Sequence, residues 1–347
     1  MFSACVIARN EEALLPRLLE SLEGCDDVVV LDTGSTDRTA DIARERGARV
    51  KEYVWRDDFA DARNECALHA RCEWVAWLDA DMHFPPGEMA RILEVLPKVP
   101  PFCDAVALQI VDEVEGGSWS SPRLYRPALC RFRGHVHEDL EAQHTMATPF
   151  RVLTGRVETD TQKETKGDRY IALLQAELEV DPFSPHALMY LRETAWIQRN
   201  YGVCAGYCKR MLEVATDYRC HHLLGLMAAQ VEKWTDALDH AFSALRMYSS
   251  DPRVHCLIAE AFDHLGRPHE SLTWYEAARA IPPEVRELGT KYIVESEDYT
   301  TVPLVGSASV LERLGRRARA VALLEEALAG TVRHRALVAT SLARVRA

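Results

Sequence analysis

The sequence predicts an α/β domain followed by an all-α domain of helical repeats. Strand-like apolar segments alternate with helix-like segments over the first eighty residues, as in a mainly parallel sheet with helical crossovers. From about residue 168 the chain is almost wholly helical. Because 347 residues suffice for two domains of ordinary size, we expect domains at 1–165 and 166–347.

Four strands and three helices build the first part of the α/β domain. We expect the strands FSACVIA, DVVVLD, ARVKEY and EWVAWLD, at residues 2–8, 27–32, 48–53 and 73–79. The helices between them are EEALLPRLLESL, STDRTADIARERG and DFADARNECALHAR, at residues 11–22, 35–47 and 58–71. Ser35 or Thr36 is the expected N-cap of the second helix, and Gly47 its end. The second and fourth strands are apolar on both faces, as a sheet covered by helices requires.

The pattern changes after residue 100. The segments DAVALQIVDEV, at 104–114, and RLYRPALCRFRGHVHEDL, at 123–140, predict antiparallel strands. They flank EGGSWSSP, which we expect to be a flexible loop at 115–122. The second half of the first domain is therefore expected to be irregular.

The helical domain has a repeat close to that of tetratricopeptide units. The pairs Asp181-Pro182 and Asp251-Pro252 are separated by two units of about 35 residues, and Ala237 and Ser271 by one unit of about 34. Helix–turn–helix units of this period indicate tetratricopeptide-like repeats.

Composition excludes several classes of protein. The net charge of −12 argues against binding of a phosphate backbone, which needs a basic face. Residues 301–347 hold eight Arg against three Glu, and we interpret this end as a solvated helical surface. The ten cysteines include no Cys-x-x-Cys pair, which favours a reducing compartment. Neither a signal peptide nor a membrane-length apolar stretch is found, so we expect a cytoplasmic protein.

Polar clusters follow three strands of the predicted sheet. They are Ala8-Arg9-Asn10-Glu11, Asp32-Thr33-Gly34-Ser35 and Asp79-Ala80-Asp81. The carboxyl ends of parallel strands form the edge at which open sheets bind ligands. The sequence therefore predicts a ligand site at this edge, although DTGSTD by itself also suits a helix cap and tight turn.

The two acids of the third cluster suggest the ligand. In an extended segment the side chains of Asp79 and Asp81 leave the same face, where two like charges repel unless a cation compensates them. Hard oxygen ligands suit Mg²⁺ or Mn²⁺, which neutralise a leaving diphosphate. We expect Asp81 to bind the metal and Asp79 to hold the ribose or the metal's water shell. Asp32 is placed to accept a hydrogen bond from a base.

Four segments together resemble a known family of enzymes. VIARNEEALLPRLLESL, VVVLDTGSTDRTADIA, WRDDFADARNECALHA and WVAWLDADMHF are similar in order and spacing to the inverting glycosyltransferases of family 2. The resemblance covers residues 1 to about 140 and implies the GT-A fold. It is strongest to the branch fused to helical repeats, which includes peptide S-glycosyltransferases of bacteriocin clusters.

The resemblance also implies roles for individual residues. Nucleotide contacts are implied for Ala8, Asn10, Glu12, Asp32 and Arg63, and the Asp-x-Asp motif for Asp79 and Asp81. RGHVHEDL is similar to the Gly-x-x-His-Glu segment of the family. It implies that His137 binds the metal or the diphosphate, and that Glu138 acts as base or holds the acceptor.

One departure from the family concerns the metal. Relatives commonly carry a His-x-Gly-Tyr segment just before the first long helix, where this chain reads TGRVETDTQKETKGDRY. The third protein ligand is therefore open, with His137 and Glu158 as candidates. Loss of metal dependence or an altered donor also stays open.

These observations predict a metal-dependent inverting glycosyltransferase. Its donor is a nucleotide-sugar, with a UDP-sugar favoured, and its acceptor a peptide or protein side chain. A second interpretation keeps the donor and takes a saccharide, a small molecule or a modified nucleic-acid base as acceptor, although the overall acidity disfavours nucleic acid. A third is a catalytically silent adaptor, which the intact Asp-x-Asp motif disfavours. The helical domain is expected to contribute to acceptor choice or to a homodimer.

Overall fold

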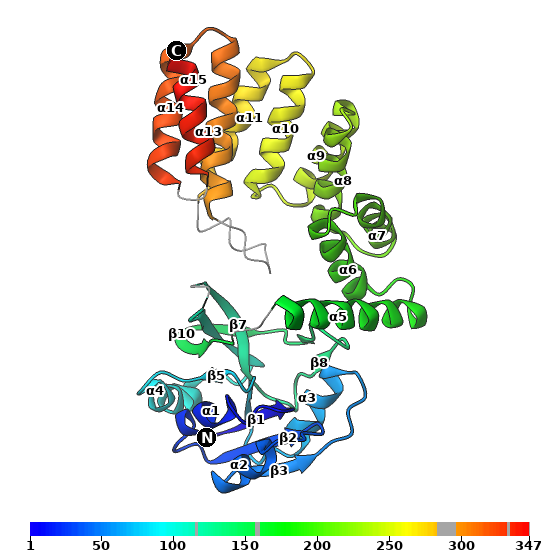
Figure 1. Cartoon of the computed structure of the whole chain (residues 1–347), viewed down its shortest axis with the longest axis vertical. Coiled ribbons are helices and arrows are strands. Elements are labelled where there is room, and N and C mark those ends of the chain that lie inside the picture. Colours follow the sequence, from blue (N-terminus) through cyan, green and yellow to red (C-terminus); the bar gives the residue numbers. More distant parts are fainter. Residues whose placement is uncertain (115–116, 157–159, 283–295, 332–333, 347) are drawn as a thin grey trace. The chain divides into compact units, whose positions relative to one another are not determined.

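The chain divides into two compact units, Met1–Val180 and Asp181–Ala347 (Figure 1). The computed structural model describes residues 1–114, 117–156, 160–282, 296–331 and 334–346. The expected boundary at residue 165 falls inside helix α5 (Asp160–Val180), which the structure groups with the first unit. Contacts explain this grouping, because Arg169 of α5 donates a hydrogen bond to Asp57 and the ring of Tyr170 lies against that of Phe59.

The first unit is built on an eight-stranded mixed sheet, with strand order β3-β2-β1-β4-β7-β6-β10-β5. The first four strands in the chain are parallel to one another, as expected. Strand β7 then runs antiparallel to both β4 and β6, and β10 runs parallel to β6. The bounds are β1 (Phe2–Ala8), β2 (Asp27–Asp32), β3 (Arg49–Glu52), β4 (Trp74–Leu78), β5 (Met82–His83), β6 (Ala105–Asp112), β7 (Ser118–Tyr125) and β10 (Thr145–Thr154).

Four α-helices precede strand β6. They are α1 (Leu15–Ser21), α2 (Thr39–Glu45), α3 (Phe59–Leu68) and α4 (Glu88–Val95), the last followed by a short 3-10 turn, Leu96–Lys98. A separate two-stranded hairpin is formed by β8 (Phe132–Arg133) and β9 (Asp139–Leu140). The expected end of the second helix at Gly47 is confirmed, since Gly47 has a positive φ of 81°.

The expected start of the second helix is wrong. Helix α2 begins at Thr39, and neither Ser35 nor Thr36 caps it. Both residues form hydrogen bonds with Asn10 instead. The Ser35 hydroxyl accepts a hydrogen bond from the Asn10 N–H at 3.0 Å, and the Thr36 N–H donates one to Asn10 Oδ1 at 2.8 Å. These bonds hold residues 33–36 against the loop after β1, and the helix starts only after them.

The expected antiparallel strands after residue 100 are confirmed, but the loop between them is shorter than expected. Strand β7 begins at Ser118, which pairs with Val111, and Trp119 pairs with Ile110. The Ser and Pro residues that suggested a loop are therefore in strand. Of the expected loop 115–122, residues 115 and 116 lie outside the described ranges.

Apolar side chains cover both faces of the central strands. Alternate residues of one strand enter different clusters, as with Val30 on one face of β2 and Val29 and Leu31 on the other. Helices α1, α2 and α4 contribute to the first cluster and α3 to the second. This confirms the expected sheet between helical layers, in which the polar residues lie at the strand ends.

The second unit consists of packed helix pairs. The residues Ser184, Asp217 and Asp251 cap successive first helices at intervals of about 34 residues, which confirms the predicted repeat. Its helices within the described residues are α6 (Pro185–Ile197), α7 (Tyr201–Val214), α8 (Tyr218–Gln230), α9 (Trp234–Met247), α10 (Pro252–His264), α11 (Pro268–Ala280), α13 (Ser296–Arg313), α14 (Arg317–Gly330) and α15 (Arg335–Arg346).

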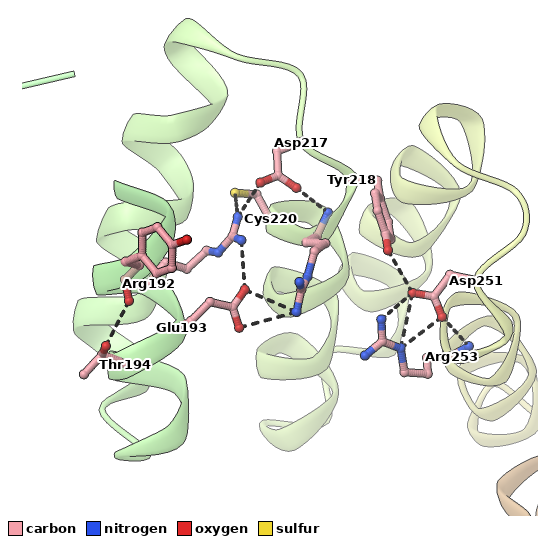
Figure 2. Close-up of polar contacts among 10 residues, drawn as sticks. Arg192, Glu193, Thr194, Asp217, Tyr218, Cys220, Asp251 and Arg253 are labelled. Carbon is pink, nitrogen blue, oxygen red and sulfur yellow. Dashed lines mark hydrogen bonds and ion pairs between the residues drawn. The ribbon is translucent and has the colours of Figure 1, made fainter. Parts of the chain in front are cut away.

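A buried polar network links successive repeats (Figure 2). Arg192 of α6 is fully buried and donates to Asp217 at 2.6 Å, to Glu193 at 2.9 Å and to the Cys220 sulfur at 2.9 Å. In the next repeat, Arg253 pairs with Asp251. The same aspartates accept backbone N–H groups at the helix starts, so each cap also neutralises an arginine.

Within the described residues, no helix combines the length and the apolar character needed to span a bilayer.

Candidate functional site

The loops after β1 and β2 are hydrogen-bonded to each other at the carboxyl edge of the sheet. Besides the bonds of Asn10, the Glu12 carboxylate accepts the Arg38 N–H at 3.1 Å, and the Glu11 N–H donates to the Thr39 hydroxyl at 2.7 Å. Asn10 has a positive φ of 57°, a conformation that Asn tolerates better than most residues. The side chains of Asn10 and Glu12 thus hold the rim of the site in place, whatever else they contact.

Asp32 lies at the end of β2, beside Ala8 at the end of β1. Its side chain is buried, and Oδ1 accepts the Ser35 N–H at 3.1 Å. The Ala8 carbonyl accepts both the N–H and the hydroxyl of Thr33. The structure therefore brings these two predicted nucleotide-contacting residues together on adjacent strands.

Asp79 is held by two arginines. Arg63 of α3 donates to Oδ1 at 2.8 Å, and Arg123 of β7 lies 3.4 Å from Oδ2. Both guanidinium groups also lie over the ring of Trp77, with Cζ 4.2 and 3.5 Å from its centroid. Burial raises the pKa of Asp79, but the two cations outweigh it and bring the pKa down to about 2. Asp79 is therefore a carboxylate fixed in position at neutral pH.

Arg123 was not predicted as a site residue, and Arg63 was predicted only from the family resemblance. Burial lowers the pKa of Arg123 to about 10, so the group stays charged at neutral pH. The only sequence signal for Arg123 is a charged residue in an otherwise apolar part of a strand.

Glu138 belongs to the same network, because its Oε1 accepts a hydrogen bond from Arg63 Nε. The hairpin that carries Glu138 is fixed to α3 by Asn64, which exchanges two bonds with the backbone of Phe132 at 2.9 and 3.0 Å. His137 is exposed, has a positive φ of 55°, and lies with its ring against that of Tyr170, 5.2 Å between centroids.

Asp81 has different partners from Asp79. The Met82 N–H donates to the Asp79 carbonyl at 2.9 Å, so residues 79–82 form a turn and not the expected extended segment. The expectation that both acids leave one face is wrong for this reason. Asp81 Oδ2 instead accepts from the Thr154 hydroxyl at 3.0 Å, at the end of β10.

A third arginine of the site, Arg156, lies beside Asp81. Arg156 donates from Nη2 to Glu11 Oε1 at 2.6 Å, and its Nε is 3.9 Å from Asp81 Oδ2. Both carboxylates are mostly buried, with side chains 14% and 15% exposed. Burial raises the pKa of Glu11 above its ordinary value, although Arg156 opposes this shift. Sequence reasoning missed Glu11 and Arg156 as site residues, even though Glu11 stands in the first polar cluster.

The oxygen atoms near Asp81 supply only part of a coordination shell for a divalent cation. Carboxylate oxygens are suitable ligands for Mg²⁺ or Mn²⁺, and such ions need few protein ligands when phosphates supply the others. Within the described ranges, however, no three His, Cys, Asp or Glu side chains gather as a metal-binding cluster. His137 contacts Tyr170, and Glu158 lies outside the described residues. Asp81 with Glu11 is the pair of carboxylates that suits such an ion.

Comparison with known proteins identifies the first part of the chain. The sequence model described as Glycosyl transferase family 2 matches residues 3–213, more than half of the chain. The chain belongs to glycosyl transferase family 2. The predicted enzyme class and the fusion of this domain to tetratricopeptide-like repeats are thereby confirmed.

Individual proteins resemble parts of this family 2 chain. The glycosyltransferase SunS of Bacillus subtilis is 27% identical over 199 residues, which are 53% of this chain and 47% of SunS. A TPR repeat-containing protein of Synechococcus elongatus is 49% identical over 80 residues, 23% of this chain and 20% of that protein. The chain thus spans less than half the length of both curated relatives.

Among solved structures, TarS of S. aureus (residues 1–349), in complex with UDP-GlcNAc, aligns with 79% of this chain. The alignment covers 87% of TarS, at 16% identity and a TM-score of 0.40.

Proposed function

We propose that this chain transfers a sugar from a nucleotide-sugar, with a UDP-sugar favoured, to an acceptor by in-line displacement with inversion. The observation that carries the proposal is the arrangement of Asp32, Asp79 and Asp81 at the carboxyl edge of a family 2 domain. Asp79 is ion-paired with arginines, and Asp81 lies beside Thr154 and Arg156. Charged groups fixed before the substrate arrives stabilise a transition state without reorganisation.

The nucleotide would lie on the loops after β1 and β2. Ala8 and Asp32 end adjacent strands, and Asn10 and Glu12 hold the loops that follow them. In this proposal Asp32 accepts a hydrogen bond from the base, and the Arg63–Asp79 pair lies near the ribose. The hydrogen bond that Asp32 accepts from the Ser35 N–H orients its carboxylate, which supports a role in recognition.

Asp81 is the proposed protein ligand for Mn²⁺ or Mg²⁺, and Glu11 is a candidate second ligand. The bound ion would neutralise the leaving diphosphate as a Lewis acid. The predicted part of His137 in metal binding stays a prediction, and the contact of His137 with Tyr170 gives it no support.

Glu138 is the proposed acceptor-side carboxylate, either as base or as a group that holds the acceptor. Its bond to Arg63 fixes Glu138 relative to Asp79, because both carboxylates share one guanidinium group. A thiol acceptor would need little help from a base, since part of it is thiolate at neutral pH. A hydroxyl acceptor would need the base directly.

The acceptor, the assembly and the compartment stay predictions. We propose a peptide or protein side chain as acceptor, because tetratricopeptide-like arrays present extended surfaces. A saccharide, a small molecule or a modified nucleic-acid base is the alternative acceptor. The proposed location is the cytoplasm, and the helical unit is the proposed site of homodimer formation.

A nucleotide-sugar hydrolysis assay with and without Mn²⁺ tests the proposal. Nucleotide-sugars are first screened by thermal shift, since a ligand that binds only the folded chain raises its unfolding temperature. We expect a UDP-sugar to raise the midpoint and to be hydrolysed slowly. A silent adaptor would neither bind nor hydrolyse any of them.

A further inference from the structure

Arg156 of the first unit lies close to two carboxylates. It follows the end of β10, where it lies between two acids from distant parts of the chain, Glu11 and Asp81. Its own side chain is 35% exposed, whereas each acid is about 15% exposed. The guanidinium group is thus the solvent-accessible member of a cluster whose carboxylates are mostly covered.

The charges of this cluster do not cancel. Two carboxylates and one guanidinium group leave a net negative charge when all are ionised. Arg156 therefore reduces, without removing, the repulsion between Glu11 and Asp81, and a cation that approaches Asp81 must compete with it.

We propose that Arg156 is a diphosphate-binding residue, held between Glu11 and Asp81 until a nucleotide donor arrives. This inference rests on the proposed function. The guanidinium group is a planar fork that matches phosphate oxygens as well as carboxylates. When a divalent cation takes its place beside the two acids, the guanidinium group of Arg156 can turn to the diphosphate.

Thr154 supports this assignment. Its hydroxyl donates to the same Asp81 oxygen, Oδ2, that faces Arg156. Asp81 therefore keeps a hydrogen bond from Thr154 on that oxygen if Arg156 leaves. Asp81 thus still has a hydrogen-bond partner after Arg156 moves away.

The test compares two full-length variants, Arg156→Gln and Arg17→Gln. Arg17 is the control, because it also pairs with a glutamate, Glu113, at 3.2 Å, and has no role in the proposed site. Calorimetry measures the affinity for UDP at saturating Mn²⁺, for uridine, and for Mn²⁺ in the absence of nucleotide. Circular dichroism checks that each variant folds.

We expect Arg156→Gln to weaken UDP binding about tenfold or more, the usual effect of losing a hydrogen bond between charged groups. Uridine has no phosphate, so its affinity should not change. Mn²⁺ alone should bind more tightly, because a competing cation is gone. Arg17→Gln should leave all three affinities within about twofold.

The outcomes separate this inference from the proposed function. UDP affinity unchanged by Arg156→Gln, or weakened equally by Arg17→Gln, would overturn the role of Arg156 alone. A wild-type chain that bound no nucleotide would overturn the proposed function and this inference with it. If Arg156→Gln misfolds, Arg156→Lys replaces it. Lys keeps the charge without the fork, and a smaller loss of UDP affinity is then expected.

Discussion

Arg63 donates from one guanidinium group to both Asp79 and Glu138, which joins the strand-end aspartate to the hairpin that follows β7. Arg63 is buried. Replacement by Met leaves two carboxylates without this partner. Breaking a buried ion pair from one side costs about 3–5 kcal/mol. We therefore expect Arg63→Met to lower the unfolding temperature strongly, as measured by calorimetry.

Arg63→Lys separates the effect of charge from that of the guanidinium geometry. Lysine keeps the charge but cannot serve both carboxylates with a planar fork. It should recover part of the stability while nucleotide binding stays impaired. Full recovery of both properties would show that charge alone matters at this position.

The buried arginine of the helical unit gives a second prediction. Asp217→Asn keeps a good N-cap for α8 but removes the charge that Arg192 faces at 2.6 Å. The free energy of unfolding should fall by about 3 kcal/mol or more. Glu270→Gln, in the exposed pair with Arg267, is the control and should cause no measurable change. Equal effects of the two substitutions in urea denaturation would rule out a special role for the network.

Gly306 supplies a third prediction. A Cβ atom there would lie 2.3 Å from the Tyr275 ring, so Gly306→Ala must displace this buried ring or move α13 away from α11. Overpacking of this kind costs about 1–3 kcal/mol. Gly206→Ala, in α7 where a Cβ meets open space, should instead stabilise by roughly 0.5–1 kcal/mol. Denaturant midpoints that move in the same direction for both variants would contradict the packing described for Gly306.

His222 makes the stability of the helical unit depend on pH. Burial lowers its pKa to about 4, against about 6.5 in an unfolded chain. Between these values the unfolded chain binds a proton that the folded chain does not. The stability contributed by neutral His222 is therefore complete above about pH 6.5. It is lost as the pH falls toward 4, by at most about 1.4 kcal/mol per pH unit.

His222→Gln should flatten the dependence of the unfolding temperature on pH over this window. His269→Gln, at an exposed position, serves as the control. Parallel curves for the wild type and His222→Gln would show that the imidazole does not carry the effect.

The order of strands and helices in the first unit follows from the sequence, because apolar periodicity reports burial directly. Val29, Val30 and Leu31 face alternate clusters as their strand pattern predicted. The helical repeat was predictable for a related reason, since each unit buries the same positions.

The side-chain pairs of the site were not predictable in this way. Glu11 and Arg156 stand 145 positions apart, and Arg63 and Glu138 stand 75 apart, so no local pattern relates them. The prediction that Asp79 and Asp81 leave the same face failed for a local reason. Alternation of side chains holds only in a strand, and the bond from Met82 to Asp79 ends the strand with a turn.

The rate of sugar transfer by an Asp81→Asn variant decides whether Asp81 acts in the proposed reaction. Asparagine keeps the shape and can still accept the bond from Thr154, but it removes a charge and a hard oxygen ligand. At saturating Mn²⁺ and UDP-sugar, we expect the rate of sugar release to fall about a hundredfold to a thousandfold. Stability without ligand should hold or rise slightly, since repulsion from Glu11 is relieved. A rate within a few-fold of the wild type would contradict the account and remove Asp81 from the catalytic site.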